Sequence, residues 1–560
     1  MTNRDFRIGP DNRTAVCFAD DDVHGPHLRR WALDRAGEWR PTEMLGRATH
    51  PQLLIGDNGA VFVYNSDNPE AGIAVYESDG RARRFAAPAG LRFVSAPRAG
   101  RSGLAMVHTD RHSELWRFEQ DAPALRERLA RVPGSLYSVY PLDPGHRLLA
   151  VDRCAYLGEL SEILAVDTED GSFSVMMEQA QVLLTHPPTG LIMVRAVVGG
   201  ASWVGWRRLG EPGPLRVPAA LNPALGRVAP LAVRPDGREV LVDERRGVSS
   251  RLRRYDLDAE RSVEVPIPMG VARSPVRWSA EGISVTLSTP DRSPRLVTAG
   301  RDDRAKDIGP ARVERMRGAD GEIESIVYGG TTWRDNPRLV LAVHGGPHSA
   351  WRYEFVPVLH GLADEGVAVI APNQRGSAGY GPAHARAIIG SMGRSDVDDL
   401  LVVAADLVRY RRARGLPPLR LLGESYGAYL ALLAAARAPR WWSHCVVLAP
   451  FLAPRRLADS GDAGVRALLT SLAVPAAPDP PDVLDSCHRI GAELLVAHGQ
   501  RDAVVPVTES RALVSRLRAA GRTPRYLEIQ DGEHELLAVG HSPVTRAVVD
   551  FLVVPTEERR

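Results

Sequence analysis

The chain has 560 residues, of which 44% are hydrophobic and 25% are charged, and both fractions are ordinary for a soluble globular protein. A chain of this length is expected to form three or four domains, or two large ones. The formal net charge is only +2, so the composition gives no reason to expect a nucleic acid or an anionic membrane as a partner.

The four cysteines lie far apart and form no C-x-x-C pair; they are Cys17, Cys154, Cys445 and Cys487. This spacing favours neither a zinc site nor a disulfide framework, so we expect a reducing compartment, no metal and no cofactor. The first residues lack the apolar core of a signal peptide, and no apolar run is long enough to span a membrane. We therefore expect a soluble, cytoplasmic protein.

Residues 1–305 alternate between short apolar runs and turns rich in Asp, Gly, Asn and Pro, which is typical of β-strands. One strongly apolar run recurs at intervals of 43–49 residues, at Val16, Val61, Ala105, Leu149, Ile192, Leu241 and Val285. A second run with an aromatic residue follows most of these, at Trp31, Tyr76, Trp116, Trp206 and Tyr255. Seven units of this length, with several strands each, predict a seven-bladed β-propeller. A β-sandwich is the alternative, and the nearly equal spacing disfavours it.

The alternation stops near residue 306, where a charged segment with turns follows. We therefore expect a linker at 306–325, between a propeller at 1–305 and a second domain at 326–560. In the second domain, apolar strands are predicted at 339–343, 367–371, 419–422, 445–449, 494–497 and 526–529. Helices are predicted between them, including 396–412, 426–437, 509–520 and 543–553. This order predicts a doubly wound, mostly parallel sheet with its chemistry beyond the carboxyl ends of the strands.

The predicted strand at 419–422 ends in Gly423-Glu424-Ser425-Tyr426-Gly427, and a predicted helix follows at once. Strand, Gly-x-Ser-x-Gly and helix together indicate the nucleophile elbow of an α/β-hydrolase. The two glycines leave room for a turn so tight that Ser425 is expected to have a strained backbone. Its hydroxyl would then lie at a helix N-terminus, where free N–H groups favour a developing negative charge.

An oxyanion needs a second backbone donor beside the N–H of Tyr426. The predicted strand at 339–343 runs directly into His344-Gly345-Gly346-Pro347. We favour the N–H of Gly346 as this donor, with Gly345 as the alternative.

The serine also needs a base and an orienting carboxylate, which follow it in the order acid, then histidine, in this fold. Asp502 lies just after the predicted strand at 494–497, and His534 lies in the short loop after 526–529. His498 is a weaker candidate for the base because it belongs to the end of its own strand. We therefore predict a triad of Ser425, Asp502 and His534.

Five motifs of the second domain resemble the prolyl oligopeptidase family of serine peptidases, most closely its acylaminoacyl-peptidase-like branch. They are HGGPHS at His344, PNQRGSAGYG at Pro372, GESYGAY at Gly423, HGQRDAVVP at His498 and DGEHE at Asp531. The first domain matches this family only in architecture. The resemblance implies cleavage through an acyl-enzyme at the domain interface, with the propeller restricting entry to oligopeptides and short acylated substrates.

The chain departs from the family pattern at three positions. Ala428 stands where another glycine is frequent, Glu509 stands where a glutamine is frequent, and Val504 replaces an arginine that can anchor a peptide carbonyl. Loss of that arginine keeps esterase activity open.

Three further residues could contact substrate: Arg375, Trp351 and Tyr380. Arg375 could equally be a loop arginine paired with a carboxylate at the sheet end. The aromatic residues Trp351, Tyr353 and Tyr380 could line a pocket, but core packing is the favoured role for at least two of them.

The leading hypothesis is a serine hydrolase that acts on short peptides. A second hypothesis keeps the acyl-enzyme but transfers the acyl group to an amine or alcohol, as in a transferase or peptide cyclase. A third is a propeller interaction protein with an inactive hydrolase domain, which the presence of all three triad residues disfavours.

Overall fold

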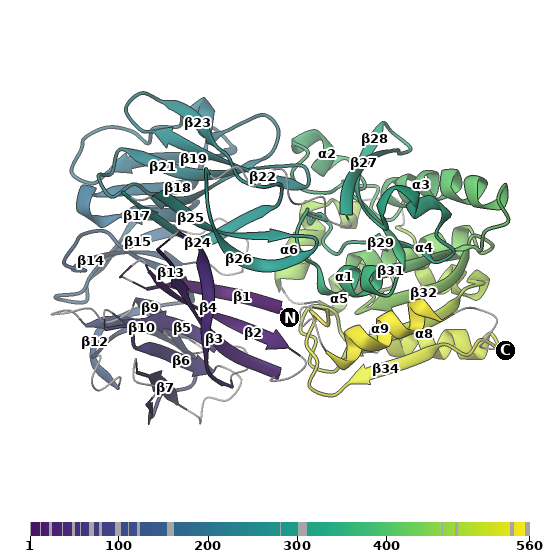
Figure 1. Cartoon of the computed structure of the whole chain (residues 1–560), viewed down its shortest axis with the longest axis horizontal. Helices are drawn as coiled ribbons and strands as arrows, with labels where there is room; N and C mark the ends of the chain where they lie inside the picture. Colours follow the sequence, from purple (N-terminus) through teal and green to yellow (C-terminus); the bar gives the residue numbers. More distant parts are fainter. Residues whose placement is uncertain are drawn as a thin grey trace.

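The computed structural model describes residues 2–554 apart from residues 10, 12, 22–24, 36, 48–50, 57, 66–71, 78–80, 96–101, 110, 120–123, 154–161, 281, 301–310, 462, 477–479 and 538–541. Cys154 thus lies outside the described residues. Two domains lie side by side (Figure 1), one made of small sheets and the other of a large sheet with helices.

The N-terminal domain contains seven antiparallel sheets, each built from consecutive strands, and we call them blades 1 to 7. Blade 1 contains β1 (Thr2–Ile8), β2 (Thr14–Asp21), β3 (Gly25–Leu33) and β4 (Trp39–Arg47), and blade 2 contains β5 (Pro51–Ile55), β6 (Val61–Asn65), β7 (Ile73–Tyr76) and β8 (Ala82–Phe85). Blade 3 contains β9 (Leu91–Ser95), β10 (Gly103–His108), β11 (His112–Phe118) and β12 (Leu125–Pro133), and blade 4 contains β13 (Leu136–Pro141), β14 (Leu148–Arg153), β15 (Glu162–Asp167) and β16 (Phe173–Met177). Blade 5 contains β17 (Ala180–His186), β18 (Leu191–Val198) and β19 (Ala201–Arg208), and blade 6 contains β20 (Arg227–Val233), β21 (Glu239–Arg246), β22 (Ser249–Asp256) and β23 (Arg261–Val265). Blade 7 contains β24 (Val271–Ser279), β25 (Gly282–Thr289) and β26 (Arg292–Thr298).

The first strands of the blades form a closed ring. Each contacts the first strand of the next blade, in the order β1, β5, β9, β13, β17, β20 and β24, and β24 contacts β1. The seam between blades 7 and 1 is packed by Leu296 against the core of blade 1, and the hydroxyl of Thr298 donates to the carbonyl of Gly37 (2.9 Å). This arrangement is a seven-bladed propeller, as predicted, and all seven recurring apolar residues lie in the second strand of their blade.

Buried polar side chains link neighbouring blades. The carboxylate of Asp152 in blade 4 accepts from the N–H of Val182 in blade 5 (2.9 Å). The hydroxyl of Ser250 in blade 6 accepts from the N–H of Ala272 in blade 7 (3.0 Å). These bonds satisfy N–H groups of first strands, which have a strand partner on only one side.

The C-terminal domain is built on one eight-stranded sheet with the order β27-β28-β30-β29-β31-β32-β33-β34. The strands are β27 (Ala311–Arg317), β28 (Glu322–Tyr328), β29 (Leu339–Val343), β30 (Ala368–Pro372), β31 (Leu419–Glu424), β32 (Trp442–Leu448), β33 (Glu493–Gly499) and β34 (Arg525–Ile529). The helices are α1 (Pro357–Asp364), α2 (Pro382–Arg386), α3 (Ser395–Arg412), α4 (Tyr426–Arg437), α5 (Pro454–Ser460), α6 (Ala463–Ser471), α7 (Val483–Ser486), α8 (Thr508–Ala519) and α9 (Pro543–Val553). From β30 to β34 the pairing is parallel, and β27 and β28 join it antiparallel.

The linker predicted at 306–325 is therefore wrong for most of its length. Residues 301–310 lie outside the described residues, but β27 and β28 form the edge of the hydrolase sheet. The charged residues that suggested a linker alternate with buried ones such as Met316 and Ile323, as expected for an edge hairpin with one face in water.

Helices cover both faces of the large sheet. Alternating residues of β29 show the division: Leu341 packs in the core with helices α3, α4 and α8, while Val340 packs in the core with α1 and α9. Strands buried on both faces read as continuous apolar runs, which explains why the central strands were predicted closely from sequence.

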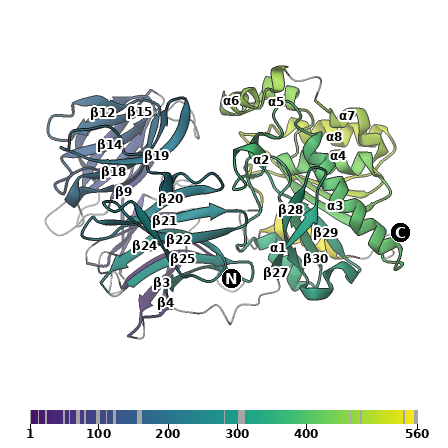
Figure 2. The same cartoon turned by 90° about the horizontal axis from the view of Figure 1, so that it is seen from above.

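The turn between β21 and β22 fastens the propeller to the hydrolase domain (Figure 2). Val248 in this turn is buried in the core that also contains α1 and α9, and its carbonyl accepts from the N–H of Tyr353 (2.7 Å). The N–H of Val248 donates to the carboxylate of Glu324 on β28 (3.0 Å), and the N–H of Gly247 donates to the carbonyl of Gly379 (3.0 Å). This β-turn thus contacts the hydrolase domain through three backbone groups, beside the edge hairpin of its sheet.

Candidate active site

Ser425 lies at the sharp turn between β31 and α4, with φ 54° and ψ −119°. The strained backbone expected from the sequence is therefore present. The glycines on either side are required by close backbone contacts. A Cβ on Gly427 would lie 2.2 Å from the carbonyl oxygen of Val343, and one on Gly423 would lie 2.3 Å from that of Gly427.

The structure brings the three predicted catalytic side chains together. The Oγ of Ser425 lies 3.0 Å from Nε2 of His534, and Nδ1 of His534 lies 2.7 Å from Oδ2 of Asp502. Because a carboxylate oxygen only accepts, Nδ1 carries the proton and Nε2 is free to accept from the serine hydroxyl. This is the tautomer that a general base requires.

Asp502 is held in place by more than His534. Its Oδ1 accepts from the N–H groups of Val504 (2.9 Å) and Val505 (2.8 Å), and its Oδ2 also lies 3.2 Å from Nε2 of the buried His498. Burial raises the pKa of Asp502, but the hydrogen bonds that it accepts, first from His498 and then from His534, outweigh burial. The pKa is held well below its usual range, so Asp502 stays ionised.

His498 thus supports the site, a role that its predicted place at the end of a strand did not indicate. The hydroxyl of Ser510 donates to its Nδ1 (2.7 Å), which leaves a proton on Nε2 for the carbonyl of Val505 (2.9 Å) and the carboxylate of Asp502. The spacing of His498 and Asp502 within HGQRD was the only signal available, and it did not show that the strand end turns His498 towards the acid.

The side chain of Glu424 is a second carboxylate beside the base. Its Oε1 is buried and has no hydrogen-bond partner in the described part of the chain. Burial raises the pKa of Glu424 to about 7, while the charge of His534 lowers it in part. In turn, burial lowers the pKa of His534, but the hydrogen bond and charge of Asp502, with a further contribution from Glu424, raise it above its ordinary value.

The oxyanion donors predicted from the sequence remain predictions, and two observations support them. Among the described residues, no acceptor is found for the N–H of Tyr426 or of Gly346. The side chain of Tyr426 is fixed by Asp396, which accepts a short hydrogen bond from its hydroxyl. The alternative donor Gly345 also lies at the elbow, because a Cβ there would be 3.7 Å from the Cβ of Ser425.

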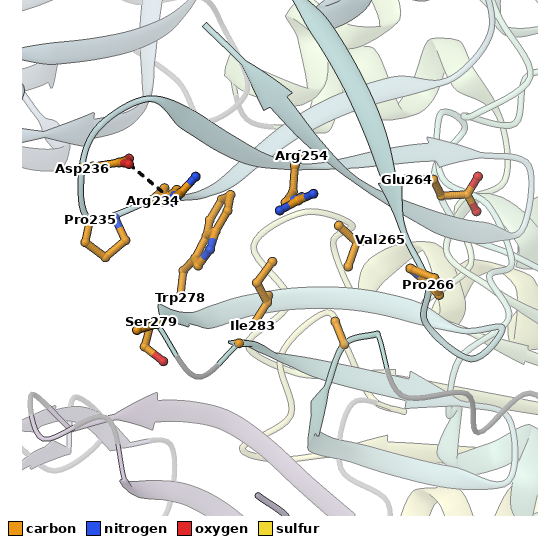
Figure 3. A pocket seen from close by; sticks show the side chains of 13 residues that line it. Arg234, Pro235, Asp236, Arg254, Glu264, Val265, Pro266, Trp278, Ser279 and Ile283 are labelled. Atoms are coloured by element: carbon orange, nitrogen blue, oxygen red, sulfur yellow. Dashed lines mark ion pairs between the residues drawn. The ribbon is translucent and has the colours of Figure 1, made fainter.

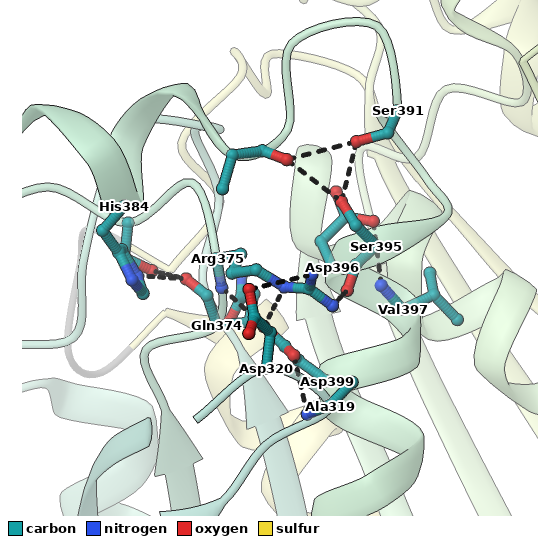
Figure 4. Close-up of polar contacts among 12 residues, drawn as sticks. Ala319, Asp320, Gln374, Arg375, His384, Ser391, Ser395, Asp396, Val397 and Asp399 are labelled. Atoms are coloured by element: carbon teal, nitrogen blue, oxygen red, sulfur yellow. Dashed lines mark hydrogen bonds and ion pairs between the residues drawn. The ribbon is translucent and has the colours of Figure 1, made fainter. Parts of the chain in front are cut away.

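Arg375 is engaged by the protein itself rather than by an open site (Figure 4). Its backbone N–H and Nε both donate to Oδ2 of Asp399 (2.9 and 3.0 Å), and Nη2 donates to the carbonyl of Ser395 (2.6 Å). The pairing that competed with a substrate role is therefore the one observed, and we withdraw the substrate contact. The carboxylate comes from helix α3 rather than from a sheet end.

The two aromatic candidates are also engaged in structural contacts. The indole N–H of Trp351 donates to the carbonyl of Ala342 (2.9 Å). The hydroxyl of Tyr380 donates to Glu324 (2.8 Å) and accepts from the amide of Asn373 (2.7 Å). Both side chains therefore support the fold beside the domain interface, and we do not retain them as substrate contacts.

In the described part of the chain, no group of three or more His, Cys, Asp and Glu side chains could hold a metal ion. None of the helices that the structure describes is long and apolar enough to cross a membrane.

A serine, histidine and aspartate in hydrogen-bond contact on this sheet define an α/β-hydrolase domain of the serine type, here preceded by a β-propeller. Residues 353–553 match the family model described as the prolyl oligopeptidase family. This stretch of the C-terminal domain thus matches the prolyl oligopeptidase family, in agreement with the resemblance carried by the motifs within it.

Curated relatives match this domain at low identity. The uncharacterized peptidase YuxL of Bacillus subtilis is 25% identical over 212 residues, covering 36% of this chain and 32% of the relative. The acylamino-acid-releasing enzyme of Sus scrofa is 26% identical over 243 residues, covering 41% of this chain and 33% of the relative. The matched stretches thus span about a third of the length of both relatives.

Solved structures match the whole chain in fold. The acylaminoacyl peptidase of Pyrococcus horikoshii has a TM-score of 0.77 at 14% identity, covering 100% of this chain and 98% of that one. A puromycin-hydrolyzing peptidase of Mycobacterium tuberculosis has a TM-score of 0.68 at 18% identity, covering 98% of this chain and 94% of that one. These likenesses show that the propeller and the hydrolase domain occur together in the same arrangement.

Proposed function

We propose that the protein is a serine hydrolase that cleaves short peptides, including N-acylated ones, through an acyl-enzyme. The single observation that carries the proposal is the hydrogen-bonded chain from Ser425 through His534 to an ionised Asp502. A structural role would not require a strained serine to face a histidine whose other nitrogen is held by a buried carboxylate.

In the first half of the reaction, Nε2 of His534 takes the proton from Ser425 as Oγ attacks the substrate carbonyl. The negative charge that develops on the carbonyl oxygen is stabilised by the N–H groups of Tyr426 and Gly346. The imidazolium, stabilised by Asp502, then gives its proton to the leaving amine as the C–N bond breaks. An ester now joins Ser425 to the acyl part of the substrate.

In the second half, His534 takes a proton from a water molecule, which attacks the ester carbonyl. The proton returns to Oγ of Ser425 as the ester C–O bond breaks, and the acid product leaves. Both halves use the same base and the same donors, so no further group is needed.

The substrate class follows from the architecture and from relatives. A matched structure is an acylaminoacyl peptidase in complex with Z-Gly-Gly-Phe-chloromethyl ketone, a short blocked peptide. The propeller beside the hydrolase domain would restrict access to peptides of this size. The described cysteines Cys17, Cys445 and Cys487 are buried and free, which supports a cytoplasmic location.

The test uses a fluorophosphonate probe and a panel of peptides with acylated or free N-termini, beside simple p-nitrophenyl esters. We expect labelling and hydrolysis by the wild type, and loss of both by at least about 10³-fold in Ser425→Ala. Ser460→Ala, which changes an exposed serine outside the site, serves as the control and should react like the wild type. Absence of labelling in a folded wild-type protein would overturn the proposal.

A further inference from the structure

A cavity of about 650 Å³ lies where the propeller ring meets the hydrolase domain. Strands β1, β17, β20 and β24 of the inner ring contribute to its wall, and Glu354 and Phe355 of the hydrolase domain close one side. A volume of this size is typical of sites for small ligands.

Four arginines line this cavity, Arg7, Arg195, Arg245 and Arg273, together with the carboxylates of Asp5 and Glu354. Arg7 donates to the carbonyl of Phe6 (2.9 Å), and two of the others have carboxylate partners. Arg273 pairs with Glu354, which joins the two domains, and Arg245 donates to the fully buried Asp243 (2.8 Å). Arg195 on β18 is different, because it has no hydrogen-bond or ion-pair partner among the described residues. Its guanidinium is half-buried in the cavity wall without an acceptor.

The charged groups that act most strongly on Arg195 are other arginines. Burial lowers the pKa of Arg195, and the charges of Arg227 and Arg245 lower it further. An arginine left without an anion beside other arginines costs folding free energy, since a buried charge is expected to be paired. A bound anion would relieve this cost.

The positive charge extends from the cavity towards the catalytic loop. Arg352 lies within electrostatic reach of both Arg245 and His344, and burial is the main reason that the pKa of Arg352 is lowered. His344 begins the loop that holds the proposed oxyanion donor Gly346. Arg245 in the cavity wall and His344 in this loop therefore share Arg352 as a charged neighbour.

We propose that Arg195, in the positive field of Arg227 and Arg245, binds the carboxylate at the free C-terminus of a short peptide substrate. This inference rests on the proposed function, because it names the substrate class of the same enzyme. A planar guanidinium matches a carboxylate with two parallel hydrogen bonds, and the C-terminal carboxylate is the one anion that every unblocked short peptide carries. Binding at the propeller would select short peptides with an open C-terminus over amidated or internal segments.

The test measures binding without catalysis. Ser425→Ala protein is titrated by calorimetry with a tripeptide, with its C-terminal amide, and with an amidated tripeptide that carries one glutamate side chain. We expect the free acid to bind at least tenfold more tightly than both amides. Adding Arg195→Gln should remove most of this preference, and Arg195→Lys should keep part of it.

A second propeller arginine provides the matched control. Arg254 lines a different cavity of about 610 Å³ beside Trp278, formed entirely by residues of blades 6 and 7 and of the segments that adjoin them (Figure 3). Arg254→Gln should leave the preference for the free acid unchanged. Equal binding of acid and amide would overturn the inference, and so would an equal loss in the two arginine variants. Tight binding of the glutamate-containing amide would overturn the assignment to the C-terminus.

The two proposals fail in distinguishable ways. If the fluorophosphonate probe does not label Ser425, the proposed hydrolase activity fails, whatever the binding experiment shows. If labelling and peptide hydrolysis are observed but acid and amide bind equally, only the inference about Arg195 fails.

Discussion

At the scale of single residues, His534, the proposed base, lies between two carboxylates with different effects. Asp502 is hydrogen-bonded to Nδ1 of His534 and stays ionised, so it fixes the tautomer. Glu424 precedes the nucleophile, and the described groups that act on its charge are His534, Glu535 and the N–H groups of Leu536 and Leu537. Its negative charge contributes to the raised pKa of His534. Glu424 therefore favours the imidazolium that forms during the reaction.

Glu424→Gln tests this role through the pH profile. His534 must be neutral to act as a base, so kcat/KM should fall as the pH drops through its raised pKa. Removal of the Glu424 charge makes the imidazolium less stable, and the acidic limb of the profile should therefore move to lower pH. The rate at high pH should fall by up to about tenfold, which corresponds to about 1.4 kcal/mol of lost stabilisation.

Glu535→Gln is the control for that experiment, because Glu535 also acts on His534 but is exposed. Water and salt screen its charge, so its profile should stay close to that of the wild type. An unchanged acidic limb in Glu424→Gln would show that Glu424 does not act on the base.

The sequence was sufficient to predict that Ser425, Asp502 and His534 meet, because the fold sets the order of the three residues and each follows a strand that could be recognised. It did not predict the role of His498 or the pairing of Arg375 with Asp399. Both depend on which side chains from distant elements meet, and a local motif carries no information about that. The unpaired state of Arg195 has the same origin.

At the scale of elements, the blades depend on a few buried polar links in addition to apolar packing. Asp152 on β14 is 2% exposed and accepts from the N–H of Val182, but its Oδ2 has no partner in the described part of the chain. Burial raises the pKa of Asp152 from 3.8 to about 7. The ionised carboxylate therefore destabilises the folded propeller.

Asp152→Asn should change how stability depends on pH. A carboxyl group with a raised pKa in the folded state contributes most below its ordinary pKa, and this contribution is lost as the pH rises through about 7. Each unit of this shift corresponds to about 1.4 kcal/mol. The asparagine keeps an acceptor for Val182 without a charge, so the loss of stability between pH 5 and pH 8 should be smaller than in the wild type. Thermal unfolding at both pH values measures it; equal losses would contradict the prediction.

Element prediction succeeded where the hydrophobic pattern was strong. Helices α4 and α9 and strand β29 have the predicted bounds, and the other predicted central strands differ by a few residues. The prediction of a linker at 306–325 was wrong, because β27 and β28 form a hairpin there. One face of this hairpin is solvated, and its charged residues hid the alternation that marks a strand.

At the scale of the whole molecule, the two domains are joined at a small number of buried contacts. One of them is made by Val248, which is 2% exposed and packs in the core of the hydrolase domain although it belongs to a propeller turn. The carboxylate of Glu324 accepts a hydrogen bond from the N–H of Val248, and the carbonyl of Val248 accepts one from the N–H of Tyr353. This turn is therefore one of the points that hold the propeller against the hydrolase domain.

Val248→Ser should loosen the docking without altering the triad. The lost apolar burial is worth about 2 kcal/mol. We expect a larger radius of gyration in small-angle X-ray scattering and faster cleavage of peptides that are too long for the wild type. Val263→Ser is the control, because Val263 belongs to the same blade and is 56% exposed. An unchanged radius together with unchanged selection by length would contradict the role of the turn.

The order of strands within the propeller ring bears on how such a domain can evolve. Each blade is built from one continuous stretch of chain, and in the described residues no sheet of the propeller combines strands from its beginning and its end. Duplication or deletion of a single gene segment of one period would therefore add or remove a complete blade and leave no strand without its sheet. The same property would let the chain be cut and rejoined between blades, so that circularly permuted propellers keep all seven sheets.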